Sequence, residues 1–268
     1  MIGIVLAVLI LGVSVFFHEL GHFLVMRRNG IKVLDFSIGF GPCLLCRKDK
    51  SGTQFTLRAI PIGGFVQPEQ AGPTSMKEAT PWVTFKVAVA GPMANCLVAF
   101  LVGLVLLYSN SPPILQHDLL AWAPDFLKPI VLSFVGSFGL AITMPLHIFY
   151  VAVTNLSQLF SSLAGPIGIV QMGSQIGGTN PTALSIGLGA LVFVWMINVG
   201  LAGANLLPFH PLDGGHCIKA IMAKIPGLNR PSVIKWFNYV TAGLLITLIV
   251  LVMTADIMRL FGINLSAL

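Results

Sequence analysis

The stretch His18-Glu19-Leu20-Gly21-His22 interrupts an N-terminal run that is otherwise suited to a membrane. No residue from Met1 to Phe17 is charged, and the apolar run resumes directly after the interruption, at residues 23–26. About 20 mostly apolar residues are enough for a helix to cross a bilayer. A charged group at the bilayer centre costs about 2.5–3.5 kcal/mol. The stretch therefore predicts a membrane helix over residues 2–26 and a polar partner for it elsewhere in the chain.

The whole chain has the composition of an integral membrane protein. Of its 268 residues, 56% are hydrophobic and 9% are charged, whereas a soluble domain carries about 25% charged residues. The net charge is +6, but the basic residues lie beside apolar runs, as they do at cytoplasmic membrane flanks. They are not interleaved with aromatic residues, as nucleic-acid-binding segments are. We therefore expect a lipid bilayer as partner, and no nucleic acid.

Four stretches are long and apolar enough to span a membrane, near residues 2–26, 85–108, 183–207 and 233–258. The segment between the first two, residues 27–86, holds nine basic and four acidic residues. This bias places it in the cytoplasm. Within it, Asp49-Lys50-Ser51-Gly52 is a turn signal between two segments that contain β-branched and aromatic residues. A small cytoplasmic β-hairpin sheet is expected over residues 33–66.

A fifth apolar region, near residues 130–153, is harder to place. The same charge bias puts both of its ends outside, Pro145 interrupts it, and polar residues recur in it at helical spacing. We interpret it as a surface or re-entrant helix, with a fifth span as the alternative. The predicted fold is a single α-helical membrane domain, residues 1–268, with about four transmembrane helices.

The interrupting stretch has the HExxH pattern of a metal site. His18 and His22 are four residues apart and share one helix face, where two imidazoles can bind one Zn²⁺ while Glu19 reaches a metal-bound water. A catalytic zinc takes three protein ligands, and the segment 205–216 holds three further candidates: His210, Asp213 and His216. Chemistry alone slightly favours a histidine, although Gly214-Gly215 would let the chain turn Asp213 inward.

These residues resemble the site-2 protease family, the M50 intramembrane zinc metalloproteases. The resemblance rests on HExxH in a first span paired with Asn205-x-x-Pro208 and Asp213-Gly214 in a later one. Several other segments are similar to the bacterial regulator of sigma-E protease subgroup, namely residues 37–42, 61–65, 90–95 and 165–169 and the pair Asn198 and Asn205.

The resemblance implies a set of roles. His18, His22 and Asp213 would be the zinc ligands, Glu19 the catalytic base, and Asn205 a group that orients substrate or stabilises the oxyanion. It also suggests substrate contacts at Gly63, Gly64, Phe65, Asn95 and Asn198.

The implied activity is that of a zinc-dependent intramembrane endopeptidase in the bacterial inner membrane. Such an enzyme takes part in regulated intramembrane proteolysis and cuts single-span membrane proteins such as anti-sigma factors. A strand edge within residues 53–66 would hold the substrate extended by β-augmentation. The alternative is a catalytically silent membrane scaffold that binds zinc.

The chain departs from the resembled subgroup in two places. Its relatives usually carry one or two PDZ domains between the second and third spans, and residues 109–129 are too few for one. His210 stands where the relatives often have proline, so the roles of His210 and His216 stay open. Cys43 and Cys46 form a lone CxxC pair, for which a zinc ribbon is not expected.

Overall fold

The computed structural model describes residues 2–108, 128–154, 166–176 and 182–261. Four long helices dominate it: α1 (Ile2–Arg28), α2 (Pro81–Tyr108), α7 (Ala183–Asn205) and α9 (Pro231–Leu260). Shorter helices lie between and beside them: α3 (Lys128–Phe134), α4 (Leu140–Thr154), α6 (Pro166–Ser174) and α8 (Asp213–Met222). Two strands, β1 (Val33–Lys48) and β2 (Gln54–Pro68), and a single 3₁₀ turn (Met76–Glu78) separate α1 from α2.

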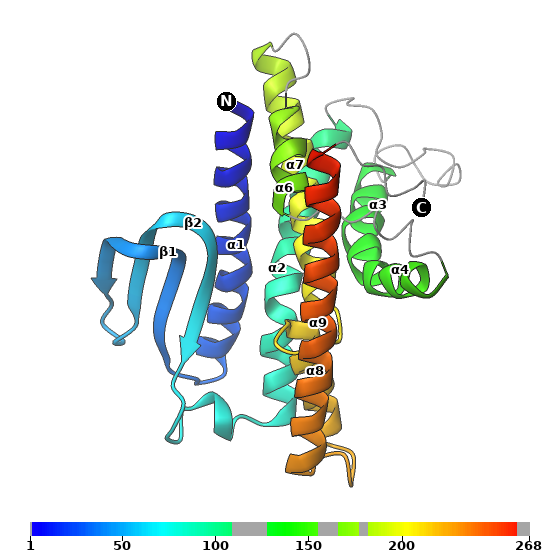
Figure 1. Ribbon diagram of the computed structural model, residues 1–268. Helices are drawn as coiled ribbons and strands as arrows, with labels where there is room; N and C mark the ends of the chain where they lie inside the picture. The colour runs from blue at the N-terminus through cyan, green and yellow to red at the C-terminus, as the bar shows by residue number, and fades with distance from the viewer. Residues whose placement is uncertain (1, 109–127, 155–165, 177–181, 262–268) are drawn as a thin grey trace.

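The long helices stand side by side, and their directions alternate along the chain (Figure 1). Small buried residues let α2, α4 and α7 approach closely, because Ala99, Ala141 and Ala202 have no exposed surface. On the other side of α7, Phe193 and Ile197 pack with Ala7 of α1. The bundle therefore joins the first and third predicted spans, which are far apart in the sequence.

Five helices of the described chain are long and apolar enough to cross a membrane by length and composition. Four of them match the predicted spans, and the fifth covers Lys128–Val151. The fold class predicted from the sequence is confirmed: a multi-pass α-helical membrane protein with a small sheet after its first helix. The fifth helix is not straight, because a π-helical turn at Val135–Gly139 separates α3 from α4. Figure 1 shows α4 turning away from the direction of α3.

The sheet flanks α1 on the side away from the other helices (Figure 1). β1 and β2 are antiparallel, and each is long enough to pair twice. Residues 35–38 of β1 pair with residues 54–57 of β2 on one side and with residues 64–67 on the other. Residues 43–48 of β1 pair with residues 54–58 of β2 along the edge that faces away from residues 35–38. Edge-to-face contacts of Phe23 with Phe36 and Phe55, at 5.3 and 5.5 Å between ring centroids, attach the sheet to α1.

The predicted hairpin is therefore present, and its second strand runs two residues past the predicted end, to Pro68. Cys43 and Cys46 form a disulfide near the far end of β1. The pair is exposed.

Candidate metal centre

Three side chains from two distant parts of the chain converge at one point. His18 and His22 come from α1, and Asp213 is the first residue of α8. The Oδ2 atom of Asp213 lies 3.1 Å from His18 Nε2 and 3.3 Å from His22 Nε2. The two Nε2 atoms are 3.2 Å apart. Among the described residues, these three side chains form the one group of His, Cys, Asp or Glu residues whose ligand atoms are close enough together to hold a metal ion.

The spacing of these atoms fits a tetrahedral metal site. Zinc binds His nitrogen and carboxylate oxygen at about 2.0–2.2 Å, which places any two ligand atoms of a tetrahedron about 3.3 Å apart. All three measured separations are close to this value. Two neutral imidazoles and one carboxylate are also a common ligand set for zinc, with the fourth position open.

The orientation of His22 is fixed from α2. Its Nδ1 atom is 2.7 Å from the Val87 backbone carbonyl oxygen. A hydrogen bond donated by the Nδ1–H group to this oxygen leaves Nε2 free to ligate a metal ion. One turn further along α2, Gly91 has no side chain where the imidazoles lie, and a β-carbon there would contact His22 Nε2 and His18 Cε1. Helix α2 therefore forms one wall of the site.

The sharp return of the chain after α7 brings Asp213 inward. A β-carbon at Gly214 would collide with the Leu206 and Leu207 carbonyl oxygens, and one at Gly215 would lie 2.6 Å from the Phe209 oxygen. The two glycines thus allow α8 to start directly against the end of α7. Burial alone would raise the pKa of Asp213, but the imidazoles of His18 and His22 beside its carboxylate lower it to about 2. Asp213 is therefore an anion poised to bind a cation.

A cavity of about 370 Å³ opens beside the three ligands. Glu19 lines it, opposite Val66 and its neighbours in β2. Asn205 lines it as well, and its side-chain nitrogen donates to the Leu201 carbonyl oxygen at 2.9 Å. The structure thus brings together all five residues to which the family resemblance assigns metal binding or catalysis.

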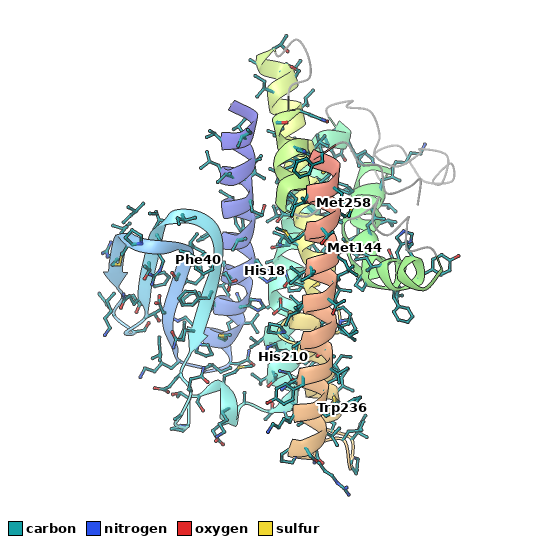
Figure 2. All side chains as sticks on the ribbon, in the orientation of Figure 1. His18, Phe40, Met144, His210, Trp236 and Met258 are labelled. Atoms are coloured by element: carbon teal, nitrogen blue, oxygen red, sulfur yellow. A yellow bond between two sulfur atoms is a disulfide. The ribbon has the colours of Figure 1, made fainter. Side chains whose placement is uncertain are left out.

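The two histidines that the sequence left open differ in position. His216 lines the same cavity, and burial lowers its pKa to about 4, so its imidazole is neutral at pH 7. His210 points elsewhere: its Nδ1 atom is 3.2 Å from Lys219 Nζ, and burial lowers its pKa too. Neither belongs to the converging group of metal-ligand atoms. Figure 2 shows His210 nearer than His18 to the end of the bundle at which α9 begins.

The five suggested substrate contacts fall into two groups. Gly64 and Phe65 line the cavity, and Gly63 precedes them in β2 with a φ of 84°. Asn95 and Asn198 do not line it, because both are fully buried within the helical bundle. Asn198 donates to the Ser14 hydroxyl at 2.9 Å and thereby joins α7 to α1.

Two contributors to the site escaped prediction from the sequence, Gly91 and the Val87 carbonyl. A backbone carbonyl leaves no mark in a sequence. Gly91 falls in the segment 90–95, whose sequence indicates the family resemblance but no role at the metal.

Comparisons with known proteins point to one family of peptidases. The family model of peptidase family M50 matches residues 6–250. Among curated proteins, one from Xylella fastidiosa strain Temecula1 is 43% identical over 98 residues, covering 33% of this chain and 22% of its own length. One from Clostridium acetobutylicum is 38% identical over 102 residues, covering 36% of this chain and 30% of its own length. Both are assigned by name as zinc metalloproteases.

A third relative, from Chlamydia trachomatis serovar D, carries the same name. It is 37% identical over 123 residues, which cover 40% of this chain and 20% of the relative. The matched part of this chain thus spans less than a third of each of these relatives.

Proposed function

Because the chain belongs to peptidase family M50, we propose that it is a zinc-dependent intramembrane endopeptidase that cuts transmembrane segments of membrane proteins. The observation that carries this proposal is the convergence of His18, His22 and Asp213 at tetrahedral spacing, with Glu19 beside them in one cavity. The names of the relatives specify zinc as the metal.

His18, His22 and Asp213 would hold the ion, and the chain's other residues would act around it. When bound, zinc supplies a Lewis acid that polarises a carbonyl and lowers the pKa of water to about 7. Glu19 accepts the proton of the attacking water and returns it to the leaving amine nitrogen. Its position one residue from His18 and at the cavity wall places the carboxylate beside the ligands.

Asn205 is placed to assist at the carbonyl oxygen. One N–H of its amide is used by the Leu201 carbonyl, and an amide nitrogen carries two donors. The second N–H can therefore donate to the oxygen on which negative charge develops. Such a donor contributes about 2.7–4 kcal/mol to transition-state stabilisation when it is well placed.

The outer edge of β2 can present the substrate. In the described chain, residues 64–67 pair with β1 on one side only, and Gly64 and Phe65 face the cavity. A helical substrate must unwind to expose its scissile carbonyl, and a strand edge can hold the unwound segment by β-augmentation. The substrates proposed are single-span membrane proteins such as anti-sigma factors, cut during regulated intramembrane proteolysis near the cytoplasmic face of the bacterial inner membrane.

The test is cleavage of a transmembrane reporter by the Glu19→Gln variant, with zinc content measured on the same preparation. Loss of a general base lowers the rate by about 10²–10⁴-fold, whereas the three ligands and the bound zinc remain. Undiminished cutting would reject the role of Glu19. Wild-type protein that holds one zinc and cuts none of a panel of single-span reporters would favour the alternative, a silent zinc-binding scaffold.

A further inference from the structure

A second cavity, of about 570 Å³, lies between the end of α1 and the start of α2. It shares no lining residue with the cavity at the metal centre. The proposed hydrolysis therefore makes no use of it.

The lining of this cavity is divided between two kinds of side chain. Val25, Val89, Ala90 and Met93 give it an apolar wall, whereas Arg28 and Lys86 are basic. Lys86 Nζ donates to Asn29 Oδ1 at 2.7 Å, which leaves two of its three N–H donors for a ligand. In the described part of the chain, no carboxylate lines the cavity or pairs with Arg28 or Lys86. The site therefore favours an anion attached to an apolar body.

Exposed tryptophans lie at and near the cavity, at the end of the bundle where α2 and α9 begin. Trp82, which is 56% exposed, lines the cavity and stacks on Phe85, with 5.5 Å between the ring centroids. Lys224 places a third cation 5.8 Å from the Trp82 ring. Trp236, which is 67% exposed, marks the same end of the bundle on α9 (Figure 2). Exposed tryptophans of membrane proteins concentrate at this interface.

We propose that this cavity is a binding site for one anionic phospholipid. Its phosphate lies between Arg28 and Lys86, and an acyl chain runs along Val89 and Met93 in the direction of the membrane interior. Basic pockets between transmembrane helices bind lipid headgroups in this way. A free phosphate would leave the apolar wall uncovered, and an acidic peptide would place backbone polar groups against it.

The site is connected to the metal centre through α2. Ala90, which lines the lipid cavity, is next to Gly91, which contacts both imidazoles. The proposal does not depend on the proposed hydrolysis, because lipid binding can be measured without a substrate.

Native mass spectrometry of the full chain, delipidated and then titrated with phosphatidylglycerol or phosphatidylcholine, tests the proposal. We expect one phosphatidylglycerol to be retained in preference to phosphatidylcholine. The variant Arg28→Gln/Lys86→Gln should lose about 30-fold in affinity for phosphatidylglycerol, the effect of two basic residues at an anionic lipid. The matched control is Lys50→Gln/Lys77→Gln, which removes the same charge from positions outside the cavity.

A second variant separates the site from a general loss of folding. Val89→Trp fills the apolar part of the cavity and leaves both cations, and it should abolish retention of phosphatidylglycerol while zinc content stays unchanged. Equal retention of the two lipids, or an equal loss in the control pair, would overturn the proposal. So would tighter binding of a soluble Glu-rich peptide than of phosphatidylglycerol, which would assign the site to a protein partner.

Discussion

At the scale of single residues, the absence of a side chain at position 91 is as important as the ligands themselves. A β-carbon at Gly91 would contact His22 Nε2 and His18 Cε1, so Gly91→Ala should displace both imidazoles from the ligand geometry. We expect zinc affinity to fall by about 10–100-fold, the range found when groups that orient metal ligands are disturbed. Competition with a chromogenic chelator measures this.

The control for Gly91→Ala is Gly243→Ala in α9, where an added β-carbon meets nothing within 4 Å. Both substitutions raise helix propensity by the same amount, so only contact with the imidazoles distinguishes them. Zinc affinities that are equal in the two variants would show that Gly91 does not set the position of the ligands.

The same scale shows how far the sequence could predict the site. The spacing of His18 and His22 is local to one helix, so HExxH alone placed them on one face. The choice among His210, Asp213 and His216 could not be made from spacing, because it depends on how closely α8 approaches α7. That approach is fixed by contacts of Gly214 and Gly215 with carbonyl groups of residues 206–209, and these appear only in three dimensions.

At the scale of elements, helices were predicted more completely than the sheet. The long helices follow from apolar runs, since length and hydropathy decide whether a segment can cross a bilayer. The turn at residues 49–52 predicted a hairpin, but not that each strand pairs twice. Register over such distances depends on which faces become buried, and Phe36 is buried where Phe16 and Phe23 of α1 lie against it.

This double pairing gives the proposed β-augmentation a definite edge, and cross-linking can test it. In a Cys43→Ser/Cys46→Ser background that also carries Glu19→Gln, Phe65→Cys should form disulfides with cysteines placed along a reporter segment. An added strand presents alternate residues to one side, so the yield should vary with a period of two. Leu57→Cys, whose strand segment is already paired on both sides, should give no cross-links. A period of three to four would indicate a docked helix and contradict the prediction.

At the scale of the whole molecule, contacts at both ends of the segment 128–174 bear on the number of crossings. Near its start, Leu132 packs against Leu107 at the far end of α2. Near its end, a β-carbon at Gly173 would contact Ala7, close to the start of α1. Because α1 and α2 run in opposite directions (Figure 1), these two contacts lie at the same end of the bundle. The segment therefore begins and ends on one side.

Between these ends, α4 approaches the end of α7 that lies at the metal centre. Gly203 of α7 stands two residues before Asn205, and a β-carbon at Gly203 would collide with Met144 of α4. Beyond the π-helical turn, α4 turns away from the direction of α3. We interpret the helix as one that enters the membrane without crossing it, which would keep four crossings although five helices of the described chain are long enough to span. This arrangement would also leave the basic segments 27–86 and 214–232 on one side, as the charge bias predicts.

We therefore predict that residue 162, which lies outside the described residues, is on the side opposite the hairpin turn. In intact cells, with Cys43 and Cys46 replaced by serine, a membrane-impermeant maleimide should label Ser162→Cys as readily as Ser111→Cys in the predicted outside loop. Ser51→Cys, in the turn between β1 and β2, should be labelled only after the membrane is permeabilised. If Ser162→Cys behaves like Ser51→Cys, the segment completes a crossing, and the chain has to cross once more before α7 begins. That return would have to be completed between residue 162 and Gly173, which lies beside Ala7, so the labelling pattern tests the arrangement of the whole bundle.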